Sequence, residues 1–244
     1  MTDWIIPDWP APASVRALVT TRAGGVSEGP YASMNLATHV GDDVAAVAEN
    51  RRRLRVRVPA EPLWLSQVHG VAVVRAEDTV EGAEADAAYT RRKGRACAVL
   101  TADCLPVLLC NDAGTAVCAA HAGWRGLAGG VIESAVRAMG EPPARLLAWL
   151  GPAIGPQAFE VGTEVRETFL AHSQEAAAAF AAKQNGKWLA DLYRLAEQRL
   201  NALGVARVFG GGYCTFSEPE RFYSFRREKE TGRMASLIWR ERVD

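Results

Sequence analysis

The stretch Thr115-Ala116-Val117-Cys118-Ala119-Ala120-His121-Ala122-Gly123-Trp124-Arg125-Gly126 joins an apolar run to a glycine-rich turn. Residues 115–120 have the length and composition of a buried strand, and we expect an amphipathic helix from about Leu127 to Met139. His121 would then stand where the strand ends, ahead of a helix start whose free N–H groups favour an anion. Glycines in such a turn are also typical of tight turns alone.

Two other apolar runs lead to a side chain that can bind a metal. Residues 62–65 run toward His69, and residues 96–100 run toward Cys104. A further strand is expected over 105–110, although Pro106 should interrupt a regular ladder there. Side chains at the ends of strands in a common sheet can converge.

His69, Cys104 and His121 together predict a metal site. With no obvious fourth ligand, one coordination position would stay open, which distinguishes catalytic zinc from closed structural zinc. Each of the three alone would be more typical of a structural residue. The set therefore favours an enzyme.

Composition limits the possible partners. The chain has 244 residues, with 28 Lys plus Arg balanced by 28 Asp plus Glu, so no net charge draws it to nucleic acid or an anionic membrane. No linker, repeat, leader or bilayer-length apolar run stands out, which predicts one cytoplasmic domain over residues 1–244. Five cysteines without a repeated spacing indicate reduced thiols, with Cys97, Cys110 and Cys118 packed inside strands.

An expected helix from Val44 to Arg57, capped by one of two preceding aspartates, carries an arginine on its inner face. Its apolar stripe of Val44, Val47, Leu54 and Val58 leaves Arg51 in the gap. A guanidinium there either forms an ion pair or lines a polar pocket, because an unpaired buried charge is costly. The other arginines of this helix lie mostly off the stripe, as on a solvated face.

Two carboxylates are further candidates. Asp103, next to a possible ligand, could orient an imidazole or simply cap a turn. Glu160, between two apolar residues, could point into a pocket or lie at a strand edge. The remaining chain predicts helices over 163–171, 174–182 and 189–203, followed by a strand over 205–209.

Short motifs spread over nearly the whole chain occur together in one known family. They are MNL at 34–36, VGDD at 40–43, NR at 50–51, SQVHG at 66–70, TADC at 101–104, HAGWRG at 121–126, GPAIG at 151–155, FEV at 159–161, FYSFRR at 222–227 and GR at 232–233. In combination they resemble the YfiH/YlmD group, which is historically called multicopper polyphenol oxidases or laccase-like proteins.

The resemblance implies an α+β fold, with layered mixed β-sheets flanked by helices, and a catalytic zinc bound by His69, Cys104 and His121. It also implies a purine nucleoside phosphorylase that cleaves adenosine, inosine, guanosine and methylthioadenosine with phosphate. The products would be the free base and ribose-1-phosphate. Adenosine deamination is implied as a further activity.

The same resemblance suggests roles for other residues. Arg51 would neutralise phosphate charge, and Arg125 or the backbone after His121 would add to that clamp. Glu160 would hold ribose hydroxyls or protonate the departing purine. Asn35 would contact substrate.

Other activities can be weighed against the residues. A multicopper oxidase needs on the order of ten imidazoles, whereas the chain has four histidines, so only a copper exchanged into the His-Cys-His site stays open. The signature of the usual zinc deaminases is absent from the sequence, so deamination would use a different arrangement.

Two non-oxidase alternatives also remain. Cys104 could be the nucleophile of a cysteine hydrolase in peptidoglycan precursor editing, a role also attached to the family. A zinc or nucleic-acid module that uses the arginine-rich helix is disfavoured by the zero net charge.

Overall fold

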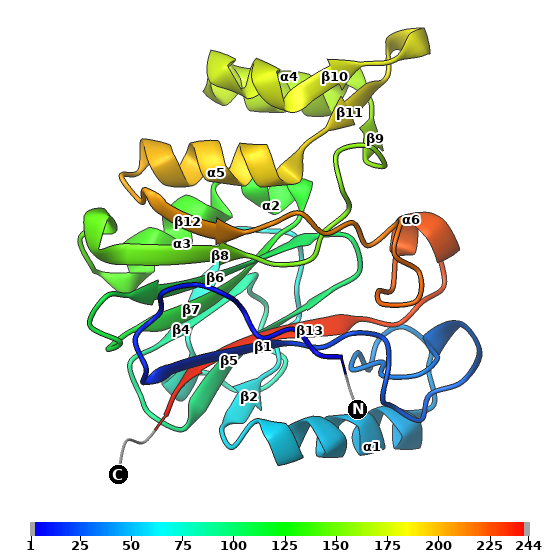
Figure 1. The fold of residues 1–244 in the computed structure, drawn as a ribbon, viewed down its shortest axis with the longest axis vertical. Coiled ribbons are helices and arrows are strands. Elements are labelled where there is room, and N and C mark those ends of the chain that lie inside the picture. Colours follow the sequence, from blue (N-terminus) through cyan, green and yellow to red (C-terminus); the bar gives the residue numbers. More distant parts are fainter. Residues whose placement is uncertain (1–2, 242–244) are drawn as a thin grey trace.

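The protein, in a computed structural model that describes residues 3–241, is built from mixed sheets with helices on their outer faces (Figure 1). The strands are β1 (Val15–Val19), β2 (Glu61–Leu63), β3 (Val73–Arg75), β4 (Ala87–Thr90), β5 (Arg95–Thr101), β6 (Leu105–Asn111), β7 (Val117–Ala122), β8 (Leu146–Leu150), β9 (Glu160–Val161), β10 (Phe180–Ala182), β11 (Trp188–Ala190), β12 (Arg207–Gly210) and β13 (Met234–Arg240). The α-helices are α1 (Val44–Arg57), α2 (Trp124–Gly129), α3 (Val131–Met139), α4 (Thr163–His172), α5 (Leu192–Ala202) and α6 (Phe225–Glu228). Short 3-10 helices are η1 (Gly29–Tyr31), η2 (Ala76–Asp78), η3 (Pro143–Arg145), η4 (Gln174–Ala179) and η5 (Gln184–Gly186).

Two large sheets form the centre of the molecule. One has the strand order β1-β13-β5-β2 and the other β12-β8-β6-β7-β4-β3. Apolar side chains of both sheets, such as Val99 of β5 and Leu108 of β6, pack in one cluster between them. Helix α1 covers the outer face of the smaller sheet, and α3 and α5 cover that of the larger one (Figure 1).

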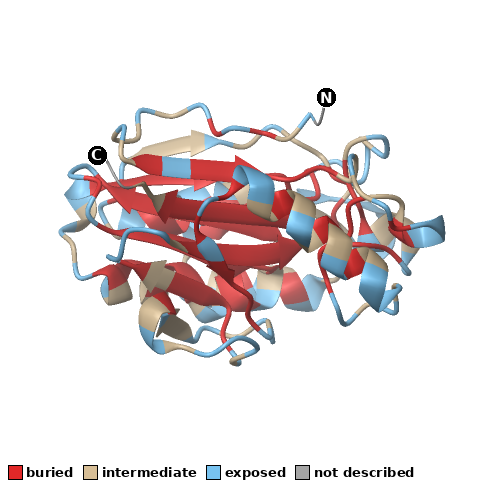
Figure 2. Ribbon diagram, turned by 90° about the horizontal axis from the view of Figure 1, so that it is seen from below, coloured by how far each residue is buried: buried red, intermediate tan, exposed pale blue. Residues whose placement is uncertain are grey.

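The central strands are covered on both faces. All seven residues of β6 are buried, and Figure 2 shows the central strands as mostly buried, with the more exposed helix α1 in front of them. Such strands read as unbroken apolar runs rather than alternating ones, which is the pattern in the sequence. The expected α+β fold of layered mixed sheets flanked by helices is confirmed. The prediction of one domain over residues 1–244 stays a prediction, and residues 1–2 and 242–244 lie outside the described part.

Helix α1 has the predicted bounds. The carboxylate of Asp43 accepts a hydrogen bond from the Ala46 N–H and caps the first turn. The predicted stripe is wrong at its first position, because Val44 is 75% exposed while Val47 and Leu54 are buried. Asn50 is also buried on this inner face and binds the preceding loop.

Other elements also differ from the sequence prediction, among them the helix expected over 189–203, which begins only at Leu192 because residues 188–190 form β11. The helix expected over 127–139 is two helices, because Gly130 adopts a positive φ of 100° between α2 and α3. The helix expected over 174–182 is η4 followed by β10, since Phe180–Ala182 pairs with β11. Pro106 does not interrupt the ladder, because it lies within β6 opposite His121.

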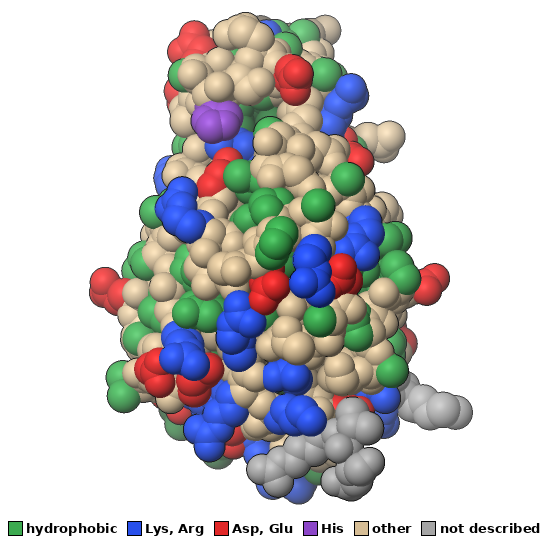
Figure 3. All heavy atoms as spheres, turned by 90° about the vertical axis from the view of Figure 1, so that its left-hand side faces the viewer, with side chains coloured by type: hydrophobic (Ala, Val, Ile, Leu, Met, Phe, Trp, Pro, Cys, Tyr) green, Lys and Arg blue, Asp and Glu red, His purple; other side chains and the backbone are tan. Residues whose placement is uncertain are grey.

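Most basic side chains of α1 are paired with carboxylates. Arg52 and Arg53 both bind Glu49, and Arg55 binds Glu61. On the face shown in Figure 3, Lys and Arg gather in the lower half with Asp and Glu between them. Across residues 3–241, no helix combines the length and apolar character needed to cross a bilayer.

Candidate metal centre and active site

Three side chains from separate segments meet where β6 begins and β7 ends. Cys104 immediately precedes β6, and His121 lies in the neighbouring β7, opposite Pro106. His69 belongs to the loop before β3. Their ligand atoms all lie within 4.8 Å of one another, and Cys104 Sγ is 3.7 Å from His69 Nε2.

This geometry fits a tetrahedral metal. Bond lengths of about 2.3 Å to sulfur and about 2.0–2.1 Å to nitrogen place the two donors about 3.5 Å apart across a tetrahedral zinc, which matches the 3.7 Å between Cys104 Sγ and His69 Nε2. The group contains no fourth His, Cys, Asp or Glu in the described chain, so a fourth position would be free. Two imidazoles and a thiolate accept zinc and copper alike, so these donors do not select one metal.

Asp86, a residue that the sequence analysis missed, holds this centre together. Its fully buried carboxylate accepts hydrogen bonds from the Val68 N–H (3.2 Å) and Gly70 N–H (2.6 Å) on Oδ2. Oδ1 accepts from the His69 N–H (2.9 Å) and lies 2.8 Å from His121 Nδ1. The acceptor at Nδ1 fixes the ring, which leaves Nε2 of His121 as the nitrogen for a metal.

The same contacts hold His69 in an unusual backbone conformation. His69 has a φ of 59°, in the left-handed region that non-glycine residues seldom adopt. The successive N–H groups of residues 68–70 donate to the Asp86 carboxylate, and these hydrogen bonds offset the conformational cost of the positive φ at His69. Burial alone would raise the pKa of Asp86, but the hydrogen bonds from His121 and Gly70 outweigh burial and lower it.

The hydrogen bonds of Asp103 go to other groups than an imidazole, so they contradict the first of the two roles expected for it. Its Oδ1 accepts a hydrogen bond from Thr215 Oγ1 (2.6 Å), and its Oδ2 accepts one from the Arg226 N–H (2.7 Å). Asp103 therefore ties the turn before Cys104 to the segment around α6. Asp86 has the role expected of Asp103. A carboxylate beside the small apolar residues Ala85, Ala87 and Ala88 was the available signal.

Cys104 and His121 form a charge pair in the metal-free site. Burial raises the pKa of Cys104, but the positive charge of His121 and hydrogen bonds from both histidines outweigh burial and lower it to about 6. Burial lowers the pKa of His121, but the Cys104 charge and the Asp86 hydrogen bond raise it to about 9. The thiolate is the form that binds metals, so a metal would replace the proton of His121.

The three candidate ligands line a cavity of about 240 Å³. Its lining residues are His39, Gln67, His69, Leu100, Thr101, Ala102, Cys104, His121, Phe225 and Arg233. Gln67 connects the loop that carries His69 to β5, because its side-chain amide donates to the Leu100 carbonyl and accepts from the Leu100 N–H. A larger hollow of about 770 Å³ near residues 92–95 contains neither histidine nor cysteine, so we assign chemistry to the smaller cavity.

Gly123 allows the close approach of the ligands. A Cβ atom at this position would lie 2.9 Å from Cys104 Sγ and 2.9 Å from His69 Cδ2. The glycine after His121 therefore contributes space beside the ligands, in addition to any turn geometry.

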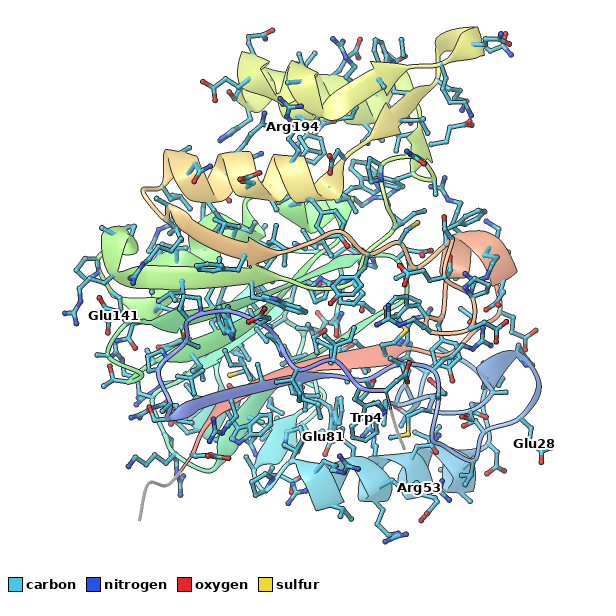
Figure 4. The ribbon with its side chains drawn as sticks, in the orientation of Figure 1. Trp4, Glu28, Arg53, Glu81, Glu141 and Arg194 are labelled. Carbon is cyan, nitrogen blue, oxygen red and sulfur yellow. The ribbon has the colours of Figure 1, made fainter. Side chains whose placement is uncertain are left out.

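Asn35 and Arg51 have protein partners rather than a place in the cavity wall. The buried Asn35 side chain donates to the Ala37 carbonyl and to Asp42, and accepts from two backbone N–H groups. Arg51 donates to the Leu36 carbonyl and to Glu81, and its Cζ lies 4.4 Å from the centre of the Trp64 ring. Figure 4 shows Glu81 beside α1.

Arg125 and Glu160 also lie outside the set of lining residues. Arg125 is exposed, and its Cζ stacks 4.4 Å from the centre of the Trp124 ring. Glu160 of β9 pairs at 2.7 Å with Lys183, which directly follows β10 in the three-stranded sheet of β9, β10 and β11. The roles suggested for these residues stay predictions.

Among the lining residues to which the sequence analysis gave no role, His39, Phe225 and Arg233 come from segments outside those of the three ligands. Each lies in one of the motifs that carry the family resemblance or beside one, and the motif was the available signal. They come from segments far apart in the chain, so spacing alone could not bring them together.

Comparisons with known proteins agree with this arrangement. Residues 16–241 match the family described as multi-copper polyphenol oxidoreductase laccase. The chain is 58% identical to a purine nucleoside phosphorylase of Pseudomonas aeruginosa, with 98% of this chain and 99% of that protein covered. It is 54% identical to the purine nucleoside phosphorylase YfiH of Escherichia coli, with the same coverage.

Solved structures show the same fold. A Neisseria meningitidis protein superposes with a TM-score of 0.96 at 51% identity, covering 98% of this chain and 100% of that one. YlmD from Geobacillus stearothermophilus gives 0.89 at 31% identity, covering 98% and 96%. Sequence and fold thus agree over nearly the whole length, and the chain belongs to the laccase-like multi-copper polyphenol oxidoreductase family, the YfiH/YlmD group.

Proposed function

We propose that the protein is a zinc-dependent purine nucleoside phosphorylase. The observation that carries the proposal is a three-donor metal group with a free position, set in the wall of a cavity that also contains Arg233 and Phe225. An arginine suits phosphate, and a half-exposed aromatic ring suits a purine base. The names of the relatives from P. aeruginosa and E. coli support the same activity.

In this reaction the bond between the ribose C1′ and the purine nitrogen breaks, and a phosphate oxygen bonds to C1′. The purine leaves with a proton, and the products are free base and ribose-1-phosphate. Zinc at the three ligands would supply a Lewis acid for an oxygen of phosphate or water. Asp86 keeps the His121 ring in place, and Gln67 fixes the segment that carries His69 against β5.

The substrates we propose are adenosine, inosine, guanosine and methylthioadenosine, with adenosine deamination as a further activity. A copper oxidase is disfavoured by the four histidines of the chain. His172 lies beside a different hollow, next to Phe169 and Leu195, so it cannot join a copper cluster at the cavity. Copper exchanged into the three-donor group stays an alternative to zinc.

A metal-free cysteine hydrolase is the second candidate, and a specific observation favours it. The Cys104 thiolate and the protonated His121, with Asp86 behind the ring, have the order of a nucleophile, base and orienting acid. A chelator would abolish the phosphorylase and spare the hydrolase. The free cysteines of residues 3–241 fit the reducing cytoplasm that we propose as its location.

The test is purine release from adenosine and inosine by zinc-loaded protein, with and without phosphate. Cys104→Ala should abolish release, whereas Cys214→Ala, which removes the other half-buried thiol, should retain it. Ribose-1-phosphate should appear in equal amount to the base. Absence of base release at every phosphate concentration would refute the phosphorylase proposal.

A further inference from the structure

We propose that Arg233 is the phosphate-binding residue of this cavity and that it holds inorganic phosphate against the His69, Cys104 and His121 group. This assignment rests on the proposed phosphorylase function and names the co-substrate site within it. The sequence analysis gave that role to Arg51. The contacts of the two arginines decide between them.

Arg233 is a cation whose outer edge has no protein partner. Its Nη1 donates to the carbonyl oxygens of Thr231 (2.8 Å) and Gly232 (3.0 Å). Among residues 3–241, no carboxylate pairs with Arg233, and neither Nε nor Nη2 has an acceptor. Nε and Nη2 form the edge of a guanidinium that binds two oxygens of one phosphate.

Arg51 differs because its Nε is occupied and its charge is paired with a carboxylate. Its Nε bonds the Leu36 carbonyl, its Nη1 bonds Glu81, and its face covers Trp64. Arg51 still contributes at a distance. Burial together with the charges of Arg233 and Arg51 lowers the pKa of His39, so both guanidinium charges reach this wall of the cavity.

Arg233 and the three candidate ligands line the same cavity. The negative charges of Cys104 and Asp103 act on Arg233 and partly offset the effect of burial, which lowers its pKa. Cys104 and Arg233 both line the cavity, so an anion between them would contact the guanidinium and a metal at once. The half-buried guanidinium forms no ion pair among residues 3–241, so its Nε and Nη2 edge is available to such an anion.

The backbone around Arg233 is built to hold it there. Asn35 Oδ1 accepts a hydrogen bond from the Arg233 N–H (3.0 Å), and the remaining amide positions of Asn35 bind Ala37 and Asp42. A Cβ atom at Gly232 would lie 2.7 Å from the Tyr223 ring, so the segment packs tightly against the core. Asn35 is therefore a positioning residue for the anion site rather than a substrate contact.

Space for the nucleoside remains beside this site. The Arg233 Cζ lies 5.8 Å from the centre of the Phe225 ring, which is half-exposed and lines the same cavity. A phosphate on the Nε and Nη2 edge leaves the aromatic ring for the base. The cavity thus separates an anion-binding part from an apolar part.

The first experiment measures phosphate binding to chelator-treated, metal-free protein by calorimetry, so that it does not depend on turnover. Arg233→Met should weaken phosphate binding roughly 10- to 100-fold, the usual effect of losing hydrogen bonds to a charged group. Arg233→Lys should retain part of the affinity. Arg145→Met is the matched control, since Arg145 is half-exposed and pairs with Asp112 at the opposite end of β6 and β8.

The second experiment measures the KM for phosphate and for inosine in zinc-loaded protein. Arg233→Met should raise the KM for phosphate by a similar factor. It should change inosine binding, measured without phosphate, much less. The assignment would be overturned if both Arg233 variants bound phosphate as tightly as wild type and had the same KM for phosphate. Absence of phosphorolysis in wild type, with Arg233-dependent phosphate binding intact, would instead refute the proposed function.

Binding of adenosine 5′-monophosphate, compared with binding of inorganic phosphate, tests whether the site prefers free phosphate or the phosphate group of a nucleotide. Weaker binding of this nucleotide than of phosphate to the metal-free protein supports the assignment to inorganic phosphate. Tighter, Arg233-dependent binding of the nucleotide would overturn it. Circular dichroism melting of each variant verifies that the fold is retained.

Discussion

Replacing Asp86 with asparagine tests how the metal centre is held together. Asparagine has nearly the shape of aspartate, but one of its two terminal atoms is an NH2 group. In the wild type, Oδ2 faces the N–H groups of Val68 and Gly70, and Oδ1 faces the His69 N–H and His121 Nδ1. Whichever way the amide turns, one pair of donors faces another donor.

The expected loss of stability follows from the number of hydrogen bonds that the amide cannot form. A hydrogen bond to a charged group contributes about 1.5–3 kcal/mol, so losing one pair should lower the free energy of unfolding by about 3–6 kcal/mol. Asp86 is fully buried, so solvent does not screen the loss. Zinc affinity should also fall about 10- to 100-fold, because the His121 ring loses its orienting acceptor.

Urea unfolding of the metal-free protein measures the first quantity, and zinc competition with a chromophoric chelator measures the second. Asp112→Asn is the matched control, because Asp112 pairs with Arg145 and Arg207 on the surface. Its effect should stay within about 0.5 kcal/mol. A loss below about 1 kcal/mol in Asp86→Asn, together with wild-type zinc affinity, would refute the role given to Asp86.

The pH dependence gives an independent check of the same variant. The pKa of Asp86 is lower in the folded protein than its ordinary value. The carboxylate therefore stabilises the fold fully above the ordinary carboxylate range, and this contribution is lost as the pH falls through the lowered pKa. The stability difference between wild type and Asp86→Asn should shrink on acidification over that interval.

Three further outcomes are expected. In metal-free protein, Cys104 should react with iodoacetamide with a pH midpoint near 6, measured by peptide mass mapping, because its thiolate is favoured; a midpoint near the ordinary value of about 8.5 would contradict this. Gly123→Ala should weaken zinc binding in a chelator titration and cost about 1–3 kcal/mol in urea unfolding, because the added methyl overlaps Cys104 and His69; unchanged zinc affinity would show that the ligands can move apart. Arg51→Met should lower the free energy of unfolding by about 1–2 kcal/mol through loss of its bonds to Leu36 and Glu81; a larger rise in the KM for phosphate than in Arg233→Met would restore the clamp role.

Local signals in the sequence predicted the features that short segments determine. Helix α1 begins after Asp43 and ends at Arg57 as expected, because capping and periodicity act within a few residues. The strand ends at Cys104 and His121 were also predictable, since buried strands show as apolar runs. The residues alone predicted that these two ends combine with His69 in a metal site, and the resemblance to a known family added zinc as the metal.

Features set by distant contacts were not predictable in this way. Asp86 acts on residues 68–70 and on His121, and neither contact has a regular spacing. Asp103 looked suitable because it adjoins Cys104, but its carboxylate points to Thr215. Residues 180–182 form a strand only because residues 188–190 pair with them, so tertiary pairing overrides local helix propensity.

The place of β13 between β1 and β5 affects how the chain can fold during synthesis. Residues 15–19 obtain their antiparallel partner only when residues 234–240 have left the ribosome. The side chains of His69, Cys104 and His121 are made long before that point. Long-range strand pairing is slow and leaves partly folded chains exposed. A nascent chain halted before residue 233 would therefore carry the metal-binding side chains without either the completed sheet or the arginine that lines the same cavity.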